Sequence, residues 1–455
     1  NEFIWLPALS SAGGDAARVL ATELIGQWMA RNGRYSEPAM APQTVARRLA
    51  HIFAHGRFVL TNSDLLWRSK LFVSLREQAK LLTRIGAEAP DGLPRLETAA
   101  VQALAGACLE DSDRRLGMGL QRLEEELGRQ ILPDGGHISR SPEALAHAYR
   151  HLVMVMDALT ATDRAVPQAI RSAHDRMAPM LRFFRHGDSA LALFNGGRES
   201  DPHMIAALLA RDEVRGQPFA HAPHSGYQRI AAARTLAIMD CGKTADGVYA
   251  NNAHAGALSF EFSHGQHRIV VNCGAAGRRN PRWDTALRAT AAHSTVTLDD
   301  TSYAGVIADG VVRDLIGPRL VGNPLTVETG RRETPQGAIV EARHDGYLHD
   351  FGVVHERVLS LSPNGLSLSG VDRVIPRDRI SRSREGIPFT VRFHIHPDVR
   401  VSPSQGGGIL LRLPSGEGWR FRCGGAHVAV DESVYLGTDM VRKAEQLVLA
   451  GVVRG

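Results

Sequence analysis

LSLSPNGLSLS (Leu359–Ser369) alternates apolar and polar residues on both sides of a Pro-Asn-Gly turn. Alternation with a period of two is typical of β-strands that bury one face, and Asn-Gly is typical of the tight turn between two antiparallel strands. The stretch therefore predicts a β-hairpin. The same alternation recurs in 391–396 and 419–422, so we expect antiparallel strands over much of the second part of the chain.

The first part of the chain has the other periodicity. Apolar residues fall on one helical face at Leu116, Leu120, Leu123 and Leu127, and the pattern ends at Pro-Asp-Gly-Gly (133–136). Such spacing predicts an amphipathic helix that ends at a strong breaker. Further helices are expected over 15–29, 44–55, 66–82, 95–108, from 142 onward and over 166–181. Many helices with short links predict antiparallel pairs wound into an (α/α) toroid.

The pattern changes after His186-Gly187-Asp188. We expect residues 189–197 to form a short apolar strand, and strands to dominate from there to the end. Helices followed by strands predict two segregated parts of an α+β chain. We therefore expect a helical toroid over 1–188 and an antiparallel β-sandwich over 189–455.

Composition and charge exclude several classes of protein. The net charge is +5, and 49 of the 53 basic residues are arginine (53 minus four lysines). Arginine binds carboxylate and sulfate in a bidentate fork, which favours an acidic partner; codon bias in a GC-rich genome explains the arginines equally well. No dense basic run is interleaved with aromatic residues, so nucleic acid is not expected as a partner.

Membrane and redox features are sparse. No apolar run reaches membrane-spanning length, and residues 1–7 lack the pattern of a signal peptide. The location is left open between periplasm and cytoplasm, and so is the oligomeric state. Four cysteines without a CxxC pair indicate neither a disulfide framework nor a zinc knuckle.

Four segments occur in a distinctive order: PDGGHISRSP (133–142), NAHAGALSFEF (252–262), VNCG (271–274) and RATAAHSTV (288–296). In this order and spacing the chain resembles the bacterial heparinase II/III-like polysaccharide lyases, along nearly its whole length. The resemblance implies an (α/α) toroid, a β-sandwich and a substrate cleft between them. It also implies cleavage of an acidic, uronate-containing glycan by β-elimination, without a required cofactor.

The chemistry of these lyases indicates which residues to expect. A group must neutralise the uronate carboxylate, a base must take the C5 proton, and an acid must protonate the leaving oxygen. The catalytic candidates are His137, Tyr149, Asn252, His254 and Tyr303. The candidate carboxylate binders are Arg68, Arg140 and Arg288.

The chain departs from the pattern of the resembled family at several positions. Relatives carry a tyrosine shortly after the Ser-Pro of the first segment, where this chain has 143–145 (Glu-Ala-Leu), so Tyr149 is a displaced substitute. Asn252 stands where relatives have a histidine, and Gly256 where they have an aspartate. The resemblance implies a structural zinc held by His254, Asn272 and His293, a set weakened by the neutral asparagine.

Alternatives stay open at each position. His137 either acts on substrate or bonds a helix end, Tyr149 is either a catalyst or a core residue, and Asn252 either binds substrate or caps a turn. The lost tyrosine and the asparagine favour a non-catalytic glycan-binding protein as one alternative. A glycoside hydrolase is another, but it needs two carboxylic acids, and Asp134 and Glu143 have no clear partners.

Overall fold

The computed structural model describes residues 1–32, 37–109, 113–212, 217–276, 280–322, 326–377, 386–404 and 408–454. By its internal contacts the chain divides into two compact units. The first comprises 1–131 and 147–175, and the second comprises 132–146 and 176–455. Segments 132–146 and 176–188 thus group with the strand-rich unit, whereas the boundary expected at residue 188 stays a prediction.

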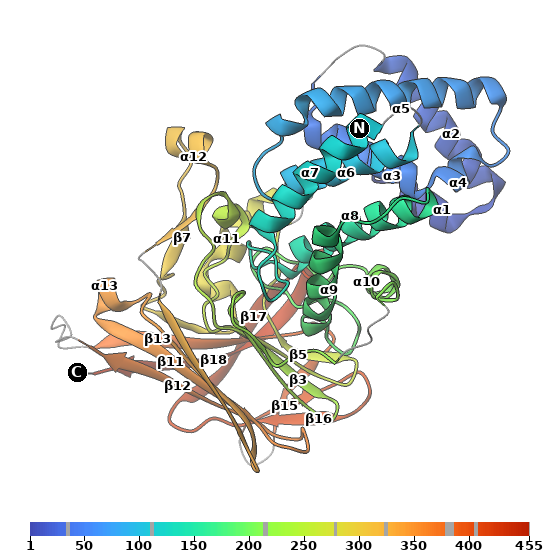
Figure 1. Ribbon diagram of the computed structural model, residues 1–455. Helices are drawn as coiled ribbons and strands as arrows, with labels where there is room; N and C mark the ends of the chain where they lie inside the picture. The colour runs from blue at the N-terminus through green and yellow to red at the C-terminus, as the bar shows by residue number, and fades with distance from the viewer. Residues whose placement is uncertain are drawn as a thin grey trace. The chain divides into compact units, whose positions relative to one another are not determined.

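The first unit is helical (Figure 1). Its helices are α1 (Leu6–Ala12), α2 (Gly14–Arg31), α3 (Pro42–Ala54), α4 (Gly56–Leu60), α5 (Leu65–Ile85), α6 (Leu93–Cys108), α7 (Asp113–Gln130), most of α8 (Pro142–Ala161) and the start of α9 (Gln168–Phe183). Each helix predicted from periodicity is present, with ends shifted by a few residues. Proline lies in the first turn of α3 and α6, where its missing N–H costs nothing.

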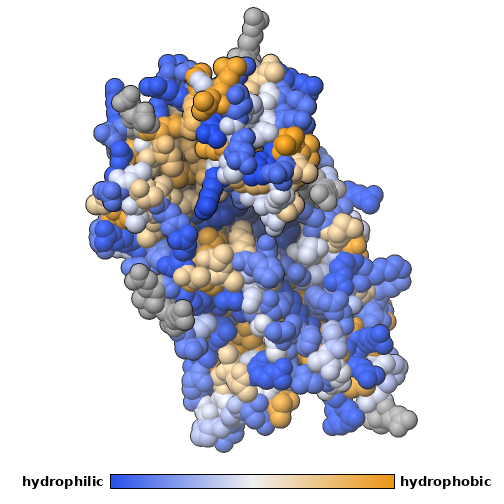
Figure 2. All heavy atoms as spheres, turned by 90° about the vertical axis from the view of Figure 1, so that its right-hand side faces the viewer, coloured by the Kyte–Doolittle hydropathy of each residue, from blue (hydrophilic) through white to orange (hydrophobic). Residues whose placement is uncertain are grey.

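Two helices of this unit also carry apolar side chains on the surface. Leu65, Leu66, Phe72 and Val73 of α5 are exposed, as are Val19 and Leu20 of α2. Figure 2 shows apolar side chains among the polar ones on the face of the helical unit that it presents. No helix in the described ranges is both long and apolar enough to cross a membrane.

The second unit consists mainly of antiparallel strands. One sheet has the order β1-β2-β3-β4-β5-β13-β18-β17, with β6 paired to β13. Its strands are β1 (His221–Ala222), β2 (Tyr227–Ala232), β3 (Thr235–Asp240), β4 (Phe260–His264), β5 (His267–Val271), β6 (Val296–Leu298), β13 (Ile387–Ile395), β17 (His427–Tyr435) and β18 (Arg442–Val453).

Three smaller sheets complete this unit. The second sheet has the order β12-β11-β10-β9, the third β14-β15-β16 and the fourth β7-β8. Their strands are β7 (Ala304–Val306), β8 (Leu320–Gly322), β9 (Val327–Thr334), β10 (Gly337–His344), β11 (Val353–Leu361), β12 (Leu368–Pro376), β14 (Arg400–Pro403), β15 (Ile409–Arg412) and β16 (Gly418–Phe421). The hairpin predicted around Asn364-Gly365 is confirmed, because Leu361 pairs with Leu368.

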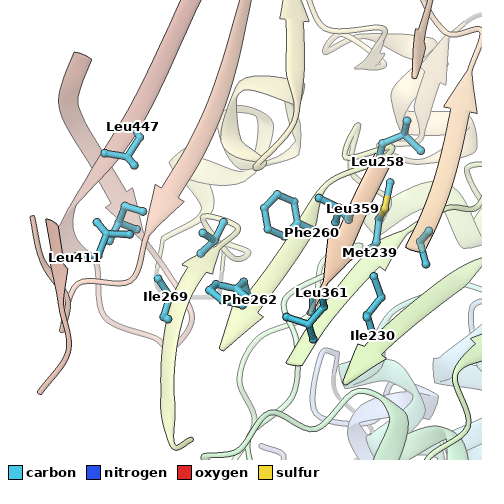
Figure 3. Packing of buried hydrophobic residues seen from close by; sticks show 14 of the residues in the cluster. Ile230, Met239, Leu258, Phe260, Phe262, Ile269, Leu359, Leu361, Leu411 and Leu447 are labelled. Atoms are coloured by element: carbon cyan, nitrogen blue, oxygen red, sulfur yellow. The ribbon is translucent and has the colours of Figure 1, made fainter. Parts of the chain in front are cut away.

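The core of the second unit lies between the sheets. Phe260 and Phe262 of the first sheet, Leu359 and Leu361 of the second and Leu411 of the third belong to one buried cluster (Figure 3). Alternation places these side chains on the inner face of their strands. The period of two seen in the sequence therefore produces this core directly.

Two predictions about the start of this unit are wrong. Residues 189–197 form no strand, apart from one bridge between Arg185 and Leu191. Ser189 and Asn195 have positive φ, which breaks an extended segment. The N–H of Leu191 bonds the carbonyl of Glu199 instead of a sheet neighbour. Strands also do not follow at once, because Asp201 caps a helix, α10 (Pro202–Leu209).

A buried arginine joins the second sheet to the loops that precede β4 and β6 of the first sheet. Arg357 of β11 is almost fully buried, donates to both carboxylate oxygens of Asp372, and bonds the carbonyls of Leu258 and Ser294. Burial alone would raise the pKa of Asp372, but Arg357 and His355 hold that pKa well below its ordinary value. The folded state therefore prefers the ionised Asp372.

We predict that Asp372→Asn lowers the free energy of unfolding by about 3–5 kcal/mol at pH 7, because it leaves a buried arginine unpaired. The folded-state pKa is depressed, so this contribution is present above the ordinary pKa of about 3.9 and is lost as the pH falls below it. Urea unfolding at several pH values measures both effects. The more exposed pair of Glu356 with Arg373 supplies the control, Glu356→Gln, with an expected loss below about 1 kcal/mol. Equal losses in the two variants would contradict the assignment.

Candidate functional site

A buried polar network organises one end of strands β2 and β3. Arg140 is buried, forms an ion pair with Asp240 at the end of β3, and donates to the carbonyls of Ser225 (2.8 Å) and Lys243 (3.0 Å). Burial alone lowers the pKa of Arg140, but the Asp240 carboxylate more than offsets it. The guanidinium therefore stays charged and holds three loops together.

The network continues toward His254. Asn195 donates to the other oxygen of Asp240 (3.2 Å) and to the hydroxyl of Tyr227 (2.8 Å). Its side-chain oxygen accepts the backbone N–H of His254 (3.4 Å). The loop that carries His254 is thus tied to the Arg140–Asp240 pair through Asn195.

His254 and His293 form a direct hydrogen bond. The Nδ1 of His254 lies 3.1 Å from the Nε2 of His293, and the Nδ1 of His293 lies 2.9 Å from the carbonyl oxygen of Ala289. Burial lowers the pKa of both rings, that of His293 to about 4, so both are neutral at pH 7. A carbonyl only accepts, so His293 carries its proton on Nδ1 and accepts at Nε2. His254 must then donate from Nδ1, which leaves its Nε2 unprotonated.

The same loop meets Tyr303. The hydroxyl of Tyr303 accepts the N–H of Ala257 (3.1 Å), three residues after His254. Burial raises the pKa of Tyr303 above its ordinary value, so the phenol keeps its proton at neutral pH. Asn252, just before His254, is exposed and ends the 3₁₀ helix 247–252. The structure therefore brings Asn252, His254, His293 and Tyr303 to one loop.

His137 belongs to the same unit but is buried. Its Nδ1 lies 2.7 Å from the Ser139 hydroxyl, burial lowers its pKa to about 4, and its ring lies edge-on to Tyr249 at 6.5 Å between centroids. Sequence reasoning missed Tyr249, although it lies only three residues before Asn252. It also missed Asn195, because an Asn-Gly-Gly turn gives no sign of a buried link.

Two candidates lie in the helical unit. Tyr149 is fully buried on α8, where its hydroxyl lies 2.8 Å from the Nε2 of His174 and its ring stacks on that imidazole. Arg68 on α5 is half-buried and donates to the hydroxyl of Ser63 (2.9 Å). Tyr149 thus has the surroundings of a core residue, and its catalytic role stays a prediction.

The arginine candidates of the second unit bind the protein's own backbone. Arg288 is 1% exposed and donates to the carbonyls of Ala253 (2.9 Å), Pro318 (2.7 Å) and Ala250 (3.1 Å). Its guanidinium therefore fixes the loop before His254. In this geometry Arg140 and Arg288 donate to backbone carbonyls and fix the loops of the site.

The expected metal ligands do not form a zinc site. The amide nitrogen of Asn272 donates to the carbonyl of Leu193 (3.1 Å), and its amide oxygen accepts the N–H of Ser294 (3.1 Å). His254 and His293 remain as a pair, and among the described residues no three His, Cys, Asp or Glu side chains are grouped to hold a metal. Structural zinc takes four close ligands, so this set does not fit it.

The carboxylates considered for hydrolysis are also engaged within the second unit. Asp134 accepts the N–H groups of Ser225 and His224, and Glu143 pairs with Arg198 at 2.8 Å. These contacts give both side chains a positioning role in their loops.

Comparison with known proteins adds the family. Residues 214–455 match the model of the "Heparinase II/III-like, C-terminal" family. The chain is 34% identical over 465 residues to "FtsZ-localized protein C" of Caulobacter vibrioides (strain NA1000 / CB15N), covering all of this chain and 79% of that protein.

Solved structures share the fold at low identity. A crystal structure of heparinase III matches 99% of this chain and 74% of its own, with a TM-score of 0.73 and 15% identity. A mutant of the heparan sulfate lyase HepC from Pedobacter heparinus matches all of this chain and 73% of its own, with a TM-score of 0.67 and 14% identity. The family match covers just over half of the chain, and the fold match nearly all of it. The chain belongs to the heparinase II/III-like family.

Proposed function

We propose that this chain is a polysaccharide lyase-like enzyme that cleaves an acidic, uronate-containing glycan by β-elimination. Membership of the family and the heparinase III fold support a polysaccharide as substrate. The same likeness supports naming the helical part an (α/α) toroid and the sheets a β-sandwich. The proposal concerns the loop that carries Asn252 and His254.

One observation carries the proposal: the hydrogen-bond chain from Ala289 through His293 to His254. It orients the His254 ring and leaves the Nε2 lone pair as its open end, and no described residue bonds that atom. A neutral imidazole oriented by a second group is the form that a general base requires. Here the orienting group is a second histidine, His293, which the carbonyl of Ala289 holds in place.

Nε2 of His254 takes the C5 proton of the uronate, the electron pair forms the C4=C5 double bond, and the C4–O bond breaks. The leaving oxygen takes the phenolic proton of Tyr303. Tyr303 is then reprotonated from solvent, and the His254 imidazolium releases the C5 proton to solvent. The exposed Asn252 amide hydrogen-bonds the uronate carboxylate, which makes the C5 proton more acidic. The step as proposed does not use His137, which is buried with its Nδ1 2.7 Å from the Ser139 hydroxyl, and the catalytic role of His137 stays a prediction.

A second candidate function is binding of an acidic glycan without cleavage. The observation that favours it is the burial of the two candidate tyrosines, whose hydroxyls already have protein partners. The lowered pKa of His254 also makes it a weak base, which slows proton abstraction. The name of the bacterial relative describes a location and agrees with either function.

We predict that the intact chain raises the ultraviolet absorbance of unsaturated uronate with one member of a panel of heparinoids, chondroitins, alginate, hyaluronan and bacterial exopolysaccharides. His254→Gln should lower kcat/KM by roughly 10²–10⁴-fold, the usual contribution of a general base. His264→Gln, at the far end of β4, is the matched control and should retain activity.

Binding of the same polymers is measured alongside by calorimetry. Binding to one polymer without any new absorbance would establish the second candidate. Full activity in His254→Gln would show that another group takes the proton.

We further predict that the chain holds no stoichiometric zinc. After dialysis against a weak chelator, metal analysis should give far less than one zinc per chain, since two neutral imidazoles supply half of a structural site. His293→Ala should lower stability by about 1–3 kcal/mol with or without added zinc, because it leaves Nδ1 of His254 unpaired. One retained zinc that is lost in both His254→Ala and His293→Ala would contradict this prediction.

A further inference from the structure

A cavity lies at the ends of β2–β5 opposite the candidate site. It has a volume of about 520 Å³ and is bounded by the turn between β2 and β3, the turn between β4 and β5, and residues 185–187. Strand β3 runs from Thr235, which lines this cavity, to Asp240, which bonds Arg140. Five residue steps of a strand span roughly 17 Å, so the cavity is separate from the loop of His254.

The lining of this cavity is cationic. Arg185, Arg229 and Arg234 line it together with His267, and its lining contains no aspartate or glutamate. Carboxylates close to this lining are already paired, among them Glu261, whose Oε2 lies 3.0 Å from Nε2 of His186. Asp188 pairs with Arg268 at 2.7 Å, and the half-exposed Glu417 lies 3.6 Å from Arg234 at the rim.

Two of these guanidinium groups have unsatisfied nitrogens. The Nε atoms of Arg185 and Arg229 are both buried and have no hydrogen-bond partner among the residues that the structure describes. Burial lowers the pKa of Arg229 to about 10, with no carboxylate to offset it. The pKa of Arg185 is lowered as well, by burial and then by the charge of Arg182. A buried donor on a charged group without an acceptor is costly, so an anionic acceptor would relieve both residues.

A hydroxyl fixes one of these arginines, and a glycine turn packs against another. Ser189 accepts from Nη2 of Arg185 (2.6 Å) and fixes that side chain from one side. Gly265 has φ +57°, and a Cβ there would lie 2.6 Å from Nη2 of Arg234. Because Gly265 has no side chain, the Arg234 guanidinium can pack directly against this turn. A methyl group at this position would push the arginine outward.

We propose that this cavity binds a tetrahedral oxoanion, sulfate or phosphate, either as the free ion or as an ester on a sugar. Three guanidinium groups supply donors in the fork geometry that such oxygens accept. The site does not depend on the elimination chemistry proposed above. The chain would then bind anions at two places, the uronate at the Asn252–His254 loop and the oxoanion in this cavity.

Calorimetry with sodium sulfate and with sodium phosphate at low ionic strength tests the site. The intact chain should bind one ion saturably, and binding should weaken as chloride is added, because salt screens exposed charge. Arg229→Gln should weaken binding roughly tenfold to a hundredfold, the usual range for a hydrogen bond to a charged group. Arg412→Gln, an exposed arginine of β15, is the matched control and should change the affinity less than twofold.

Two further variants keep the test decisive. Arg234 is largely exposed, so Arg234→Gln should fold normally and weaken binding even if Arg229→Gln proves unstable. His254→Gln should leave sulfate binding unchanged, which separates this site from the lyase proposal. No saturable binding of either ion, or unchanged affinity in folded Arg234→Gln and Arg229→Gln, would overturn the site.

A pair of sugars distinguishes the source of the anion. Tighter binding of a sulfated monosaccharide than of free sulfate, lost on desulfation, would support an ester on a glycan. Equal affinity for the two would support the free ion at the same site.

Discussion

The buried ion pair between Arg140 and Asp240 determines how the candidate site is assembled. Both side chains are almost fully buried, and isolated burial of either charge would cost several kcal/mol. The pair is satisfied because Arg140 also bonds backbone carbonyls and Asp240 also accepts from Asn195. Arg140 has φ +63°, a conformation that persists only where surroundings enforce it. This ion pair thus joins segment 132–146 to the end of β3, and Asn195 extends the link to the His254 loop.

This constraint explains why several residues expected to face a ligand face the protein instead. Arg140 and Arg288 donate hydrogen bonds to carbonyls of the loops around His254. The loops are then rigid enough for two neutral imidazoles to share one hydrogen bond beneath the surface. Two arginines at the far end of β2–β5 differ, because the Nε atoms of Arg185 and Arg229 have no acceptor among the described residues. Whether an arginine is satisfied by its own fold is what separates a structural cation from a binding one.

Much of the architecture could be predicted from periodicity. The helices of the first unit and the hairpin at Asn364-Gly365 follow from spacing and turn chemistry that act locally. The conformation of residues 189–197 could not be predicted, because their side chains pack on the sheet although their backbone does not join it: Leu193 packs with Val271 and Tyr435, and Phe194 with Tyr227. Serine rarely adopts the positive φ that Ser189 has, so the sequence does not signal this break in an extended segment. Within the site, the positions of His254 and His293 were anticipated from the family pattern. Their mutual bond and the role of Asn195 depend on contacts between residues about 40 to 60 apart, which no local pattern encodes.

The central claim is that Nε2 of His254 is an unprotonated acceptor whose tautomer is set by His293 and Ala289. Long-range ¹⁵N–¹H correlation spectra of the histidine-labelled chain at pH 7 measure this directly, with His254→Gln and His293→Gln used to assign the two rings. The account predicts two neutral rings, each protonated on Nδ1. A proton on Nε2 of His254, or a charged ring at either position, would contradict it.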